Sequence, residues 1–93
     1  MEGEMMAHAD MNPTIADEAP SSESITAYDE SHYVVYVRLL DARADGASAD
    51  EMARVVLGID PSQEPSRAEK AVSSHLRRAQ WMTENGYRRL LGH

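Results

Sequence analysis

Two helix-start signals separated by a long turn constrain the fold of this chain more than any other feature. Each signal is a capping box, in which a serine is followed three residues later by a glutamate: Ser48 with Glu51, and Ser66 with Glu69. Apolar residues at helical spacing follow each box. Residues 58–65, between the two patterns, include two prolines, which exclude a continuous helix. The pattern predicts a helix-turn-helix whose turn is longer than the roughly three or four residues of the usual motif.

The remaining periodicity predicts an all-α domain of about four helices. Asp29 is a suitable N-cap for the first helix, and Asp45-Gly46 and Gly58 suit the ends of the first and second helices. Because the 93-residue chain has no Phe, one Trp and no cysteine, we expect a modest aliphatic core without disulfides. The expected domain covers residues 25–93, with helices at 29–44, 49–57, 67–84 and 87–91.

The first expected helix carries apolar residues on two nearly opposite faces. One face consists of Tyr33, Tyr36, Val37, Leu40 and Ala44, and the other of Val35, Leu39 and Ala42. Either this helix is central and covered on both sides, or one face stays exposed for a partner. The pattern leaves both arrangements open.

The outer face of the third expected helix is the candidate binding surface. It carries basic, hydroxyl and aromatic side chains: Arg67, Lys70, Ser74, Arg77, Arg78 and Trp81. In a helix-turn-helix protein such a face reads the major groove, where arginine contacts guanine edges and lysine contacts phosphates. Tryptophan and arginine are also frequent where proteins contact each other. On the opposite face, His75 lies among apolar residues and is expected to be a hydrogen-bonded core residue.

Charge is distributed unevenly along the chain, whose net charge is −7. Residues 1–23 contain six acids and no Lys or Arg, so we expect residues 1–24 to form a disordered acidic tail, either simply solvated or mimicking nucleic-acid charge. Residues 24–65 contain eight acids and three bases, whereas residues 66–93 contain two acids and six bases. Part of this polarity should be paired internally. Because a uniformly basic surface is absent, we do not expect the chain to bind DNA.

Other functional classes find no support in the residues. Residues 41–52 resemble a calcium-binding loop in part, but Arg43 and Met52 stand where ligands are required. The histidines fall at no metal-ligand spacing, and there is no phosphate loop, nucleophile elbow or paired-carboxylate pocket. We therefore expect no catalytic residue, metal, cofactor or small-molecule substrate. A signal peptide and a membrane-spanning apolar run are also lacking, so we expect no membrane partner and a cytoplasmic protein.

Several blocks of sequence resemble a domain-of-unknown-function family that is common on proteobacterial conjugative elements. These blocks are residues 39–42, residues 57–60 and the segment HLRRAQWMTENGYRRLL from His75 to Leu91. The resemblance implies an extended-turn helix-turn-helix domain. Some members of that family are transcriptional activators that use a basic face on DNA, whereas others are stand-alone antiactivators.

The resemblance, taken with the acidic front half and the lack of a preceding folded domain, implies an antiactivator. Such a protein binds and sequesters transcriptional activators, including a LuxR-type quorum sensor and a related helix-turn-helix activator, and so represses excision and transfer of the conjugative element. We expect its partner-binding surface to include Val35, Leu39, Leu90 and Leu91. The alternative is a DNA-binding transcriptional repressor or accessory factor that uses the basic face of the third helix.

Overall fold

The computed structural model describes residues 14–86, and every regular element within this range is helical. In chain order the elements are α2 (Ala27–Ser31), α3 (Tyr33–Ala44), α4 (Ala49–Glu51), η1 (Met52–Leu57), α5 (Pro65–Trp81) and η2 (Met82–Gly86). The two η elements are stretches of wider, π-type helix, and they continue α4 and α5 without a break. Among these residues no helix is long and apolar enough to cross a bilayer. The all-α prediction is confirmed, whereas the expected helix at 87–91 lies outside the described residues.

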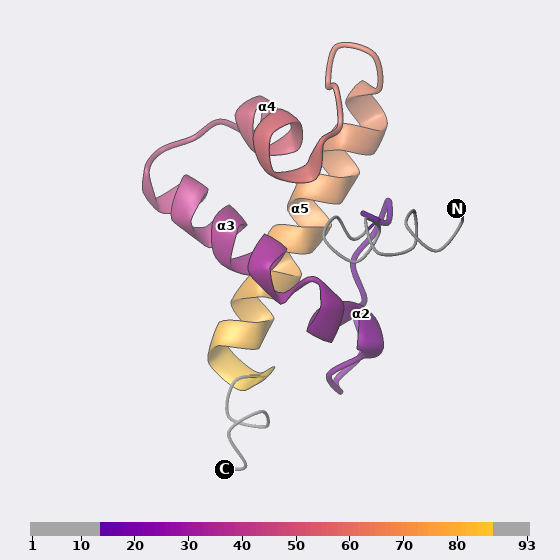
Figure 1. Cartoon of the computed structure of the whole chain (residues 1–93), viewed down its shortest axis with the longest axis vertical. Coiled ribbons are helices and arrows are strands. Elements are labelled where there is room, and N and C mark those ends of the chain that lie inside the picture. Colours follow the sequence, from indigo (N-terminus) through magenta and orange to yellow (C-terminus); the bar gives the residue numbers. More distant parts are fainter. Residues whose placement is uncertain (1–13, 87–93) are drawn as a thin grey trace, which may run out of the picture.

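The predicted helix-turn-helix corresponds to α4 with η1, the turn at residues 58–64, and α5. Figure 1 shows α5 as the long central helix, and α5 packs against α3, α4 and η1. The capping box predicted at Ser48 and Glu51 is present, because each side chain accepts a hydrogen bond from the other residue's backbone N–H. Gly58 ends η1 in the left-handed conformation, with φ of 71°, which glycine adopts without steric cost.

Two helix starts differ from the prediction. Thr26, not Asp29, caps the first helix: its hydroxyl accepts from the Asp29 N–H, and the Asp29 carboxylate accepts from the Thr26 N–H at 2.8 Å. That helix is also interrupted at His32, where α2 ends and α3 begins. The second capping box, at Ser66, does not form, because α5 already begins at Pro65. Proline at the first helical position has the helical φ built in and needs no hydrogen bond for its missing N–H.

The core lies where α3, η1 and α5 meet. Its larger cluster consists of Val35, Leu39, Met52, Ala53, Leu57, Ile59, Ala68, Ala71 and Val72, and a smaller one consists of Tyr36, Ala79 and Met82. Val35 and Leu39 are only 8% and 0% exposed, so they do not form the accessible partner surface that we expected. The side of α3 that stays exposed includes Tyr33, Val34 and Val37 instead. Leu90 and Leu91, the other two residues of that expected surface, lie outside the described residues.

The N-terminal segment that precedes α2 packs against the helices. We call residues 14–25 the strap. Ile15 packs against the larger core cluster and Ile25 against the smaller one, and Figure 1 shows the segment running beside α5 and α2. The expected disordered tail therefore does not extend to residue 24, because these two isoleucines give the acidic segment an apolar attachment at each end. Residues 1–13 lie outside the described residues.

Candidate nucleic-acid interface

One face of α5 and its continuation is open to solvent over its whole length. The exposed residues on this face recur every three or four positions, the spacing of one helix face, and are Ser66, Lys70, Ser73, Arg77, Gln80 and Glu84. The opposite face is buried against the other helices through residues such as Ala71, His75 and Ala79. Of the predicted binding face, only Lys70 and Arg77 lie fully on this exposed stripe. Ser66, Ser73 and Gln80 were missed, although the same helical spacing places them beside Lys70 and Arg77.

The strap covers the flank of α5 next to this stripe. The Asp17 carboxylate accepts a hydrogen bond from Arg67 Nε at 2.7 Å, and Arg67 also pairs with Glu64 at 3.1 Å. Ser74 is buried, and its Oγ accepts from the Ala19 N–H at 3.0 Å. Two of the predicted DNA-contacting side chains, Arg67 and Ser74, are therefore already engaged within the chain.

Arg78, another predicted surface residue, is buried in the centre of the domain. Its guanidinium pairs with Asp29, with Nη2 2.6 Å from Oδ2 and Nε 3.0 Å from Oδ1. The same guanidinium donates to the backbone carbonyls of Ser22 and Ser24 in the strap. It also lies 4.0 Å from the ring centroid of the half-buried Trp81, in cation–π geometry. Arg78 thus ties α5 to the strap and α2, and it is not available to a ligand.

The Asp29 carboxylate is fully buried and is held in its charged form. Burial by itself raises its pKa, but hydrogen bonds from Arg78, from the Tyr36 hydroxyl at 2.6 Å and from Thr26 outweigh burial and lower the pKa to about 2. The same arrangement raises the pKa of Tyr36, mainly through burial and then through its bond to the anionic Asp29. The ion pair between Asp29 and Arg78 joins an acid of residues 24–65 to a base of residues 66–93, as the charge distribution predicted.

His75 is a hydrogen-bonded core histidine, as predicted. Its Nδ1 lies 2.7 Å from the Ala71 carbonyl, so Nδ1 donates, and Nε2 accepts from the Tyr28 hydroxyl at 2.5 Å. The Tyr28 oxygen in turn accepts from the Ala16 N–H of the strap at 3.0 Å. Burial lowers the pKa of His75, although the bond to Ala71 acts in the opposite direction. A neutral His75 imidazole satisfies both of these hydrogen bonds, one as donor and one as acceptor.

Within residues 14–86 there is no cluster of three or more His, Asp or Glu side chains able to hold a metal ion.

The sequence of this domain matches a known protein family. Residues 4–92 match the family model described as the DNA-binding domain of a T6SS transcription factor. The chain belongs to this family of DNA-binding domains. No curated protein matches the chain.

The expectation that this DNA-binding domain would not bind DNA is therefore wrong. The error lay in requiring a uniformly basic surface over the whole domain, because most of the acids lie in residues 1–65 and few lie in the segment that contains α5. A phosphate interacts mainly with charges within a Debye length of about 8 Å. For a phosphate at the exposed stripe of α5, the nearby charges include Lys70 and Arg77. The family match supports a role in regulating transcription, as the resemblance to the conjugative-element family implied. The link to conjugative elements stays a prediction.

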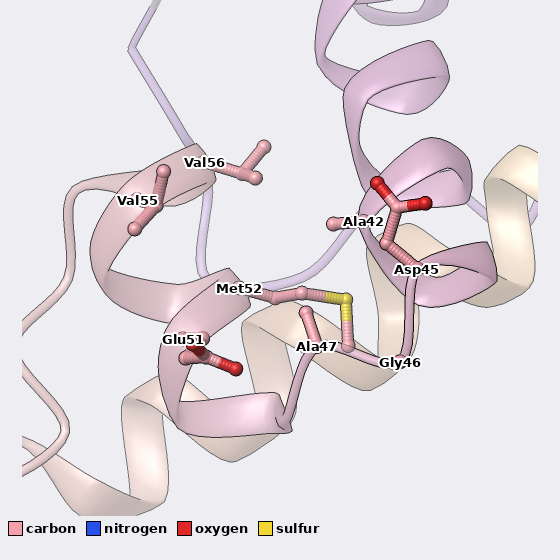
Figure 2. Close-up of a pocket in the computed structure, with 8 residues that line it drawn as sticks. All are labelled: Ala42, Asp45, Gly46, Ala47, Glu51, Met52, Val55 and Val56. Carbon is pink, nitrogen blue, oxygen red and sulfur yellow. The ribbon is translucent and has the colours of Figure 1, made fainter.

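The DNA-binding domain also has an apolar groove between α3 and η1. It has a volume of about 350 Å³, and Figure 2 shows Met52 reaching from η1 toward Ala47, with Val55 and Val56 above it. The charged residues that line the groove, Asp45 and Glu51, are acidic. Because phosphates are anionic, these carboxylates exclude the groove as a phosphate-binding site.

Proposed function

We propose that this domain regulates transcription by placing the exposed stripe of α5 in the major groove of duplex DNA. One observation carries the proposal: in this member of a DNA-binding family, the second helix of the helix-turn-helix presents a polar face with two bases to solvent. In this class of motif, the second helix supplies the base contacts and the first helix crosses the backbone. A regulator of this kind acts in the cytoplasm, where a bacterial chromosome lies.

The side chains of the stripe have separable roles. Arg77 has the fork of donors that matches the O6 and N7 acceptors of guanine, and Lys70 is suited to a phosphate. Ser66 and Ser73 are short hydroxyl donors nearer the start of α5. The helix N-terminus there adds a partial positive charge that favours phosphate.

A fluorescence anisotropy titration with a random-sequence duplex pool at low salt tests this proposal. We expect the double variant Lys70→Ala/Arg77→Ala to bind about tenfold more weakly or worse, because it removes two charge-assisted contacts. The matched control is Arg43→Ala/Arg54→Ala, which removes the same charge from exposed positions on α3 and η1. Equal losses in the two variants, or undetectable binding by the folded wild type, would contradict the proposal.

A second candidate is the antiactivator function, in which the domain occupies a protein instead of DNA. The observation in its favour is the acidic front half, with eight acids against three bases in residues 24–65. An in vitro transcription assay distinguishes the two functions. An antiactivator lowers activated transcription from a promoter to which it shows no affinity of its own, whereas a DNA-binding regulator acts only where it binds.

A further inference from the structure

The strap lies where a DNA backbone would approach α5. It covers the flank that carries Arg67, Ser74 and Trp81, directly beside the exposed stripe with Lys70 and Arg77. A small pocket of about 130 Å³ marks the boundary, lined by Pro20 and Ser21 of the strap and by Arg77 and Trp81 of the helix. A helix seated in the major groove is flanked on both sides by phosphates. The strap therefore occupies one of these two flanking positions.

Like a phosphate backbone, the strap is anionic. Its charged residues are Asp17, Glu18 and Glu23, and it contains no base. The Asp17 carboxylate meets the Arg67 guanidinium at 2.7 Å, as a phosphate oxygen would. Nearby, the Ala19 N–H donates a hydrogen bond to the Ser74 hydroxyl oxygen. The strap thus already makes hydrogen bonds to Arg67 and Ser74, two side chains of α5 that are suited to contacts with DNA.

We propose that the strap competes with DNA for the flank of α5, so that DNA affinity depends on displacement of residues 17–21. This inference rests on the proposed DNA-binding function and adds a regulatory element to it. Arg67 is the side chain that changes partner, from Asp17 in the free protein to a phosphate in the complex.

The middle of the strap is held differently from its two ends. The second half is anchored in the interior: Arg78 binds the carbonyls of Ser22 and Ser24, and Ile25 packs on the smaller core cluster. The first residues are held by Ile15 on the larger core cluster, by the Thr14 carbonyl 2.6 Å from His32 Nε2, and by the Ala16 N–H, which donates to the Tyr28 hydroxyl. Between the two ends, Asp17 pairs with Arg67, and their side chains are 66% and 37% exposed. Exposed pairs of this kind are screened by salt and are weak. Residues 17–21 lie between these attachments and can therefore move away from α5 while Ile15 and residues 22–25 stay in place.

A reversible cross-link tests the displacement directly. The chain has no cysteine, so the double variant Ala19→Cys/Ser74→Cys introduces one disulfide between the strap and α5, at positions already joined by a 3.0 Å hydrogen bond. We expect the oxidised form to bind the duplex pool about tenfold more weakly than the same protein after reduction. Equal affinities, or tighter binding by the oxidised form, would overturn the competition while leaving the DNA-binding function intact. If reduced variant and wild type both fail to bind DNA, both proposals fail together.

A pair of single substitutions separates competition from general repulsion. Asp17→Asn and Glu18→Gln each remove one negative charge at adjacent positions, but only Asp17 contacts Arg67. We expect Asp17→Asn to raise DNA affinity several-fold, since it weakens the strap and releases Arg67 from Asp17. We expect Glu18→Gln to change DNA affinity less than about twofold, because exposed charges are screened. Equal gains would show that the strap acts only through its charge, which is contrary to the proposal.

Discussion

Replacing Asp29 with asparagine should remove a large part of the domain's stability. The carboxylate is 0% exposed and accepts hydrogen bonds from Thr26, Tyr36 and Arg78, and only the last of these donors is charged. In Asp29→Asn the guanidinium stays buried without a counter-ion, a situation that typically costs about 3–5 kcal/mol. A domain of this size has a total stability of about 5–15 kcal/mol. The variant should therefore be close to the limit at which it remains folded.

The charged state of Asp29 also makes the stability of the domain depend on pH. Its pKa falls from 3.8 to about 2 on folding, which corresponds to about 2 kcal/mol of stabilisation. Because the folded pKa is lower than the unfolded one, this stabilisation is fully present above about pH 4 and is lost as the pH falls toward 2. Asp29→Asn should lack this component of acid sensitivity.

Urea unfolding followed by circular dichroism measures both effects. With a slope of about 1–2 kcal/mol per molar urea, a loss of about 3–5 kcal/mol should lower the midpoint of Asp29→Asn by about 1.5–5 M. The control is Glu30→Gln, an exposed neighbour in the same helical turn, which should change stability by less than about 0.5 kcal/mol. A loss below about 1 kcal/mol in Asp29→Asn would show that the buried pair does not hold the domain together.

Three further substitutions test other parts of the structure. Tyr36→Phe removes one donor to the buried Asp29 carboxylate and should cost about 1–3 kcal/mol in the same urea assay. Gly58→Ala places a side chain at φ of 71° and should cost about 1 kcal/mol through backbone strain alone, because nothing lies within 4 Å of the added Cβ. Since burial lowers the pKa of His75, its neutral form stabilises the fold above the unfolded pKa of 6.5, and stability should fall as the pH drops below that value. Thermal unfolding at a series of pH values checks this, and His75→Gln should remove the dependence.

Local signals predicted the positions of the helices in the described residues and several of their ends. The capping box at Ser48 and the glycine at Gly58 depend only on neighbouring residues, and both are present. The prediction of Asp29 as the N-cap of the first helix is wrong. Thr26 and Asp29 form a capping box with aspartate in place of glutamate, and the break at His32 has no local sequence signal. At α5, the competing start signal of Pro65 prevailed over Ser66.

The candidate site was harder to predict, because its exposure depends on residues far along the chain. Helical spacing identifies which residues share a face of α5, but it does not show that the strap covers one flank. An arginine such as Arg78 is expected at the surface, but it is buried because it pairs with Asp29, which is 49 residues away in sequence. The sequence signal for the strap was the presence of Ile15 and Ile25 at the two ends of an otherwise acidic segment. Isolated isoleucines in such a segment indicate attachment to a core.

The number of accessible bases on α5 leads to a quantitative expectation for the salt dependence of DNA binding. Each neutralised phosphate contributes about −0.9 to the slope of log affinity against log salt. Lys70 is exposed and is the base suited to a phosphate, so with the strap in place the slope is about −1. Release of Arg67 from Asp17 adds one phosphate contact, which brings the slope to about −2 in the reduced form of Ala19→Cys/Ser74→Cys. A slope much steeper than this in both redox forms would place the main phosphate contacts outside the described face of α5 and would refute the assignment of the interface.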